Sequence, residues 1–193
     1  MSMKHCITAV GTLVTLALAS SGHAQILTPP AVPPQIEVTG PNQAFLIGHA
    51  IGTQNYECQP VASVGRVGWV LFTPQATLFG ELDEQLTTHF FSPNPAEGRV
   101  VRATWQDSQD TSTVWAQATG SAVVDADAIA WVRLQKSGTQ VGPTGGTTLA
   151  VTTFIQRVNT VGGLAPTTGC DRPTDVAKKA FVPYTADYVF YRN

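Results

Sequence analysis

Charged residues are scarce in this 193-residue chain, in which only 12% of the residues are Asp, Glu, Lys or Arg. The 11 basic and 13 acidic residues nearly cancel, leaving a net charge of −2, and the basic residues form no cluster. Proteins that bind nucleic acids need clustered Lys and Arg to neutralise phosphates. The composition therefore argues against a nucleic-acid partner.

The sequence also lacks the motifs of several enzyme classes. It contains no G-x-S-x-G, no H-E-x-x-H and no G-x-G-x-x-G. The glycine-rich stretch 142–146 lacks the Gly-Lys-Ser/Thr ending of a phosphate-binding loop. Because strands and helices do not alternate either, the sequence argues against nucleotide-dependent dehydrogenases and kinases, and no cofactor is predicted.

Long apolar runs are confined to the N-terminus. Residues 1–24 read as a secretory signal peptide: a short segment with Lys4, the apolar segment 7–18, and small residues ending at Ala24. A membrane-spanning helix needs about 20 apolar residues, and no later segment meets that requirement. We predict a signal peptide cleaved near Ala24, no membrane span, and a soluble protein that is secreted or periplasmic.

Cysteines are few as well. Cys6 leaves with the signal peptide, so Cys58 and Cys170 remain as an even pair in an oxidising compartment. We predict a disulfide between them, which joins the first third of the fold to the last. Two free thiols are the alternative.

Helical periodicity is absent, because no segment carries an apolar i, i+3, i+4, i+7 stripe over eleven residues. Residues 25–41 contain five prolines and predict an extended, mobile N-terminal arm, followed by a single β domain over 42–193. Short runs rich in Val, Thr, Ile and aromatic residues alternate there with turn residues. They predict strands at 44–50, 53–59, 68–72, 76–79, 88–91, 100–105, 113–118, 129–135, 148–159 and 183–191. The fold class is therefore all-β, an antiparallel β-sandwich or barrel of about 8–10 short strands with little or no helix.

Two histidines, His49 and His89, remain after signal removal. Together with a carboxylate such as Glu57 or Glu81 they have the chemistry to bind a metal ion or to transfer protons. The alternative is that each is a structural, hydrogen-bonded residue, and no metal site is predicted.

Two tryptophans and one arginine complete the candidate ligand-binding residues. Trp105 and Trp115 flank the polar segment 106–113, so both indoles share one face if that segment closes a hairpin with Trp105 opposite a residue near 113–115. Such a pair forms either a platform for sugar rings or part of the core. Arg157 lies within a strand and either points to solvent or pairs with an acid, the candidates being Asp125, Asp127 and Asp187.

Several blocks together resemble the family known as domain of unknown function 3455, exported proteins of bacteria and fungi. They are residues 48–58, 88–90, 103–106, 110–115, 128–134, 155–166, 169–170 and 182–191. The resemblance covers about residues 42–191 and implies a single secreted domain with a Cys pair. It supplies no activity, cofactor or catalytic residue.

Two functional hypotheses follow. The first is a non-catalytic, exported module that binds a small molecule or a polysaccharide or associates with the cell surface, with His49, His89, Trp105, Trp115 and Arg157 as candidate ligand-binding residues. The second is a hydrolase or metal-dependent enzyme that uses both histidines with nearby carboxylates. A cleft that holds at least one His and one Trp would favour the first. Two imidazoles close to each other, or to a carboxylate in a pocket, would favour the second.

Overall fold

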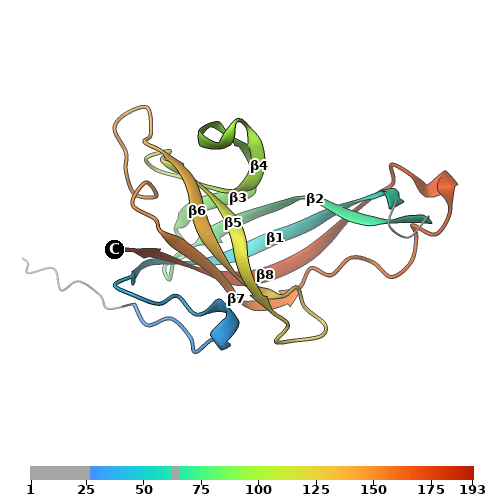
Figure 1. The fold of residues 1–193 in the computed structure, drawn as a ribbon, viewed down its shortest axis with the longest axis horizontal. Helices are drawn as coiled ribbons and strands as arrows, with labels where there is room; N and C mark the ends of the chain where they lie inside the picture. The colour runs from blue at the N-terminus through green and yellow to red at the C-terminus, as the bar shows by residue number, and fades with distance from the viewer. Residues whose placement is uncertain (1–26, 62–65) are drawn as a thin grey trace, which may run out of the picture.

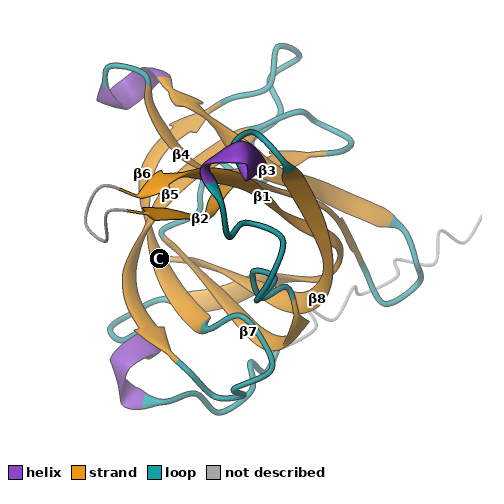
Figure 2. Cartoon of the chain, turned by 90° about the vertical axis from the view of Figure 1, so that its right-hand side faces the viewer, coloured by secondary structure: helices purple, strands orange, loops and turns teal. Residues whose placement is uncertain are grey.

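The structure is a computed structural model that describes residues 27–61 and 66–193. The predicted signal peptide, residues 1–24, lies outside the described residues. Eight strands form one closed antiparallel barrel in which each strand pairs with its neighbours in sequence and β8 closes on β1 (Figures 1 and 2). The strands are β1 (Gln43–Val61), β2 (Arg66–Phe79), β3 (Gln85–Asn94), β4 (Val100–Asp107), β5 (Thr113–Ala122), β6 (Trp131–Gln140), β7 (Phe154–Gly162) and β8 (Lys179–Arg192). Among the described residues there are three single-turn 3₁₀ helices: η1 (Pro34–Ile36) precedes β1, and η3 (Pro95–Glu97) and η4 (Pro173–Asp175) lie in connections between strands.

The all-β prediction is confirmed, and of its two architectures the molecule has the barrel. Ten predicted strands become eight because β1 and β2 each run through a residue that reads as a break. Gly52 lies within β1 opposite Ala76, where a β-carbon would collide with the backbone of β2. Pro74 lies in the part of β2 that pairs with β1 but not with β3. The missing N–H of the proline therefore removes no hydrogen bond to β3.

The barrel interior is packed by complementary small and large side chains. Gly48, Ala50 and Ala76 line the β1–β2 side, opposite aromatic residues of β4 and β8. Trp105 and Phe190 are both fully buried, and their rings meet edge to face at 6.1 Å. Two loop residues complete the same cluster, Ile129 from the β5–β6 connection and Leu149 from the β6–β7 connection.

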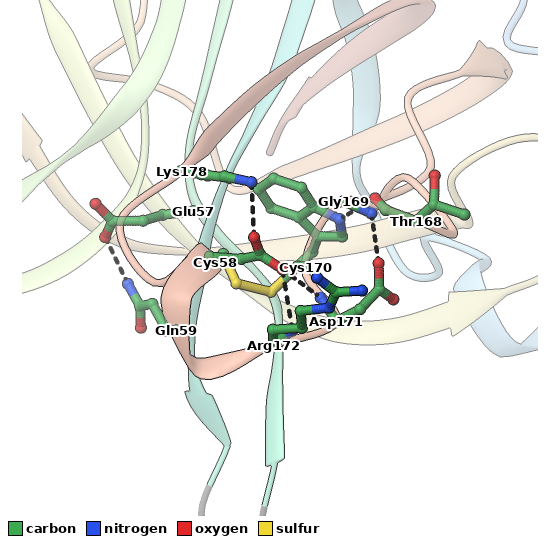
Figure 3. Close-up of a disulfide and its surroundings, with 11 residues drawn as sticks. Glu57, Cys58, Gln59, Thr168, Gly169, Cys170, Asp171, Arg172 and Lys178 are labelled. Carbon is green, nitrogen blue, oxygen red and sulfur yellow. Dashed lines mark hydrogen bonds and ion pairs between the residues drawn. A yellow bond between two sulfur atoms is a disulfide. The ribbon is translucent and has the colours of Figure 1, made fainter.

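β1 and β2 continue beyond the barrel as a projecting hairpin (Figure 1). The β2–β3 ladder covers only Ala76–Phe79 of β2, so residues 66–75 pair with β1 alone. The connection between β7 and β8 packs on this hairpin, and Trp69 Nε1 donates to the carbonyl of Thr168 at 3.0 Å. The predicted disulfide is confirmed: Cys58 of β1 is bonded to Cys170 of this connection, with the Cα atoms 5.5 Å apart (Figure 3).

The Pro-rich arm is extended, and its described part is packed on the barrel, which argues against the predicted mobility. Its described part, from residue 27, packs on the outside of the barrel, where η1 contacts β5 and β6. Ile36 is fully buried, and its carbonyl accepts a 2.6 Å hydrogen bond from Gln156 Nε2. Val32 and Val38 cover a second apolar cluster centred on Val158 and Val189. The arm therefore stabilises the outer face of β7 and β8.

No helix in residues 27–61 and 66–193 is long and apolar enough to cross a membrane.

Candidate functional site

A groove of about 680 Å³ lies where β2 separates from β3. The last pair of that ladder joins Ala76 to His89, and beyond it the Phe91 N–H donates to the Thr73 hydroxyl at 3.0 Å instead of to a main-chain carbonyl. Ile51, Thr77 and Thr88 place the groove on the outer face of the wall, because they alternate with core-side residues along their strands. Ala76 and His89 belong to the inner face and border the groove where the two strands part. It is lined by Ile51, Thr53, Thr73, Pro74, Gln75, Ala76, Thr77, Thr88, His89 and Phe90.

The groove is uncharged and combines polar with apolar groups, and no Asp, Glu, Lys or Arg is among its described lining residues. The Thr53 hydroxyl donates to Asn55 Oδ1 and the Thr73 hydroxyl donates to its neighbouring carbonyl, so both are already engaged. Thr77 and Thr88 are direct cross-strand partners, and neither hydroxyl makes a hydrogen bond with another residue in the described part of the chain. Two adjacent hydroxyls are therefore available to a ligand.

His89 lies beneath this groove as a buried, neutral imidazole. Burial lowers its pKa to about 3, although a hydrogen bond from Nδ1 to the Thr104 carbonyl opposes that shift. Because a carbonyl only accepts, Nδ1 carries the proton and Nε2 is left as an acceptor. The ring stacks on Trp105 with centroids 4.2 Å apart and planes 9° apart, and it meets Tyr188 at 5.2 Å. His89 thus connects the floor of the groove to the aromatic core.

The two tryptophans lie on opposite faces of the barrel wall. Trp105 pairs with Val114 and faces the core, whereas Trp115 pairs with Thr104 and faces outward. The shared face expected from the sequence is therefore wrong. Trp115 is only 6% exposed, its Nε1 donates to the Ser92 hydroxyl at 2.8 Å, and it borders a separate cleft of about 460 Å³.

His49 also lies on the face opposite to His89, so the two imidazoles do not meet. It points outward from β1, with Nδ1 2.7 Å from Asp187 and Nε2 3.3 Å from Glu81. Asn159 Nδ2 donates to the other oxygen of Asp187 at 2.7 Å and so orients that carboxylate. The hydrogen bond with Asp187 is the main reason that the pKa of His49 is raised, with Glu81 adding to it against a partial loss from burial.

Comparison with known families identifies the domain. The model of the family described as "Protein of unknown function (DUF3455)" matches residues 39–192. The chain belongs to this family. No curated protein and no solved structure matches it.

In this DUF3455 domain Arg157 neither points to solvent nor pairs with an acid, the two alternatives predicted from the sequence. It is half-buried and pairs with the core residue Tyr188, so it faces the barrel interior. Its Nε and Nη2 donate to the carbonyl of Ala130, at 3.3 and 2.8 Å, and no acid pairs with it within the described ranges. Of the predicted acids, Asp187 lies on the outer face with His49.

The groove threonines were missed because Thr is an ordinary residue on an exposed strand face. Alternation alone places Thr77 on the phase opposite to Leu78. The register that brings Thr77 beside Thr88 comes from the β2–β3 ladder, which local sequence does not specify. No group of three or more His, Cys, Asp or Glu side chains placed to hold a metal ion occurs among the described residues.

Proposed function

We propose that this DUF3455 domain is a non-catalytic binding module whose ligand occupies the groove between β2 and β3. The observation that carries the proposal is an uncharged groove of about 680 Å³ with two unengaged, adjacent hydroxyls on Thr77 and Thr88. Binding sites combine apolar surface with a few placed polar groups, and here Ile51 and Phe90 supply the apolar part. A neutral, hydroxyl-rich ligand, a saccharide chain or a small polyol, suits this lining.

Of the five ligand-binding residues predicted from the sequence, only His89 belongs to the proposed site. His89 lines the groove, and Trp105 supports its ring from the core side. Trp115, Arg157 and His49 do not line this groove.

The test is direct titration with neutral oligosaccharides of several linkages, such as cellohexaose, maltohexaose and chitohexaose. The double variant Thr77→Val, Thr88→Val keeps the shape of both side chains and removes both hydroxyls. We expect it to weaken binding about tenfold or more, since each lost hydrogen bond contributes roughly 0.5–1.5 kcal/mol. Thr139→Val, which alters the cleft beside Trp115, is the matched control and is expected to bind as the wild type does. Loss of binding in the control but not in the double variant would move the site to that cleft.

A second candidate function has one observation in its favour. The Asp187–His49 pair, with Asn159 orienting the acid and Glu81 at the other ring nitrogen, is an arrangement suited to proton transfer in a hydrolase. Because His89 lies on the opposite face, proton transfer in such a hydrolase would involve His49 and its neighbouring carboxylates without His89. Hydrolysis of chromogenic ester or glycoside substrates that disappears in His49→Gln would support it.

We also propose that the protein is exported by its N-terminal segment. The support is the disulfide between Cys58 and Cys170, because such bonds persist in oxidising compartments. N-terminal sequencing of the protein purified from its host is expected to start at Gln25.

A further inference from the structure

The outer edge of the projecting hairpin is an unprotected β-strand edge. Residues 66–75 of β2 pair with β1 on one side, and on the other side no described residue forms a main-chain ladder with them. A strand edge of this kind carries N–H and C=O groups that are ready to pair with another chain.

The sequence of this edge offers little protection against such pairing, with one charge at its start, Arg66, and one proline near its end, Pro74. Proteins usually protect edge strands with charged side chains or prolines. From Val67 to Phe79 β2 has no charged residue, and Pro74 is its single proline. Val70 and Leu71, one on each face of the strand, are both 36% exposed.

From these features we infer that two copies of this chain associate through antiparallel pairing of their β2 edges. A second copy is the partner that the edge fits, because the same strand supplies an equally uncharged, apolar edge. Antiparallel pairing of identical strands is also closed by a two-fold axis, so the contact ends at a dimer. This inference does not rest on the ligand proposed for the groove, although residues 73–75 belong to both surfaces.

The register that centres the two-fold axis on Val70 gives complementary cross-strand pairs. Trp69 then faces Leu71 of the second copy, and Leu71 faces the second copy's Trp69. Phe72 lies opposite Gly68, where no side chain competes for space. Aromatic and aliphatic cross-strand pairs of this type stabilise antiparallel sheets.

The position of the hairpin removes the obvious steric objection. It projects from the barrel (Figure 1), so antiparallel pairing places the two barrels at opposite ends of the shared sheet. The inner face of the hairpin is covered by the β7–β8 connection, which the disulfide and the Trp69–Thr168 bond hold in place. The edge, rather than that face, is the surface available for association.

Analytical ultracentrifugation of the disulfide-bonded chain over a concentration series tests the inference. We expect a reversible monomer–dimer equilibrium for the wild type. Val70→Lys and Val70→Glu each place like charges at the two-fold axis and are expected to raise the dimer dissociation constant at least about tenfold. An equimolar mixture of the two variants is expected to restore the dimer, because Lys then faces Glu.

Val161→Lys on β7 is the matched control: it adds the same charge at a residue that is 64% exposed, and it is expected to dimerise as the wild type does. Thermal melting of each variant checks that it is folded. A wild type that is monomeric throughout the series would overturn the inference. So would a dimer that persists in both Val70 variants alone.

Discussion

At the scale of single residues, the two histidines respond to pH in opposite directions. His49 has a raised pKa, so its protonated form favours the fold; that contribution is complete below pH 6.5 and is lost as the pH rises through the raised value. His89 has a pKa lowered from 6.5 to about 3, so the unfolded chain takes up a proton that the folded chain excludes. Its contribution is complete above pH 6.5 and is lost as the pH falls toward 3.

His89→Phe is therefore expected to change how stability depends on pH. At pH 7 the variant loses the bond to the Thr104 carbonyl and unfolds about 1–3 kcal/mol more easily than the wild type. Between pH 6.5 and 3 the wild type loses up to about 1.4 kcal/mol per pH unit through His89, whereas the variant does not. Urea unfolding of both proteins across this range measures the difference. A constant gap between the two curves would mean that His89 is already charged in the fold.

The faces of these side chains show how far sequence reasoning reaches at this scale. Alternation along 48–58 puts His49 on the opposite phase from Ala50, so its outward direction follows once Ala50 is placed in the core. For Trp105 and Trp115 the result depends on a turn that pairs Trp105 with Val114. Had the partner been residue 113 or 115, both indoles would share a face. A one-residue difference in the β4–β5 register decides whether the two indoles share a face, and composition does not determine that register.

At the scale of elements, the N-terminal arm shows how prolines can hide a packing segment. Five prolines in residues 25–41 correctly indicate extended backbone, but extended backbone can still pack. The overlooked signal is the set of apolar residues between the prolines, Val32, Ile36 and Val38. Val32 and Val38 cover apolar residues of β7 and β8 that would otherwise face water, and Ile36 is itself fully buried.

We expect Ile36→Ala to lower the free energy of unfolding by about 2–3 kcal/mol, because Ile36 is fully buried and its truncation leaves a gap against the barrel. Gln35→Ala alters the exposed neighbouring residue of η1 and is expected to change stability by less than about 0.5 kcal/mol. Chemical denaturation of the two variants makes the comparison. Equal stabilities would mean that the arm is not held on the barrel in solution.

At the scale of the whole molecule, closure of the barrel and the disulfide both depend on contacts distant in sequence. β8 pairs with β1 over most of its length, and Cys58 is joined to Cys170 across 112 positions. The all-β class and the approximate positions of the strands could be predicted from local patterns, although two strands were each divided at a Gly or a Pro. Whether the strands form a barrel or a sandwich could not be predicted, because a barrel requires the first strand to pair with the last.

The disulfide is expected to stabilise the fold substantially. In the chain-entropy model a loop of this length contributes about 4–5 kcal/mol, and loss of that amount lowers the Tm by roughly 10 °C. Calorimetry of the oxidised protein and of the Cys58→Ser, Cys170→Ser double variant measures the shift. Thiol titration of the denatured, unreduced protein purified from its host is expected to find no free thiol among these two cysteines, and two reactive thiols would contradict the bond.

The central claim is that the groove between β2 and β3 is where this domain binds its ligand. The most direct measurement is backbone amide NMR of the labelled protein during titration with a set of neutral mono- and oligosaccharides. We expect the shifted amides to cluster at residues 75–77 and 88–90, around the hydroxyls of Thr77 and Thr88. Shifts that cluster instead at Trp115 and Thr139, or that leave 75–77 and 88–90 unchanged while the saccharide binds, would contradict the claim.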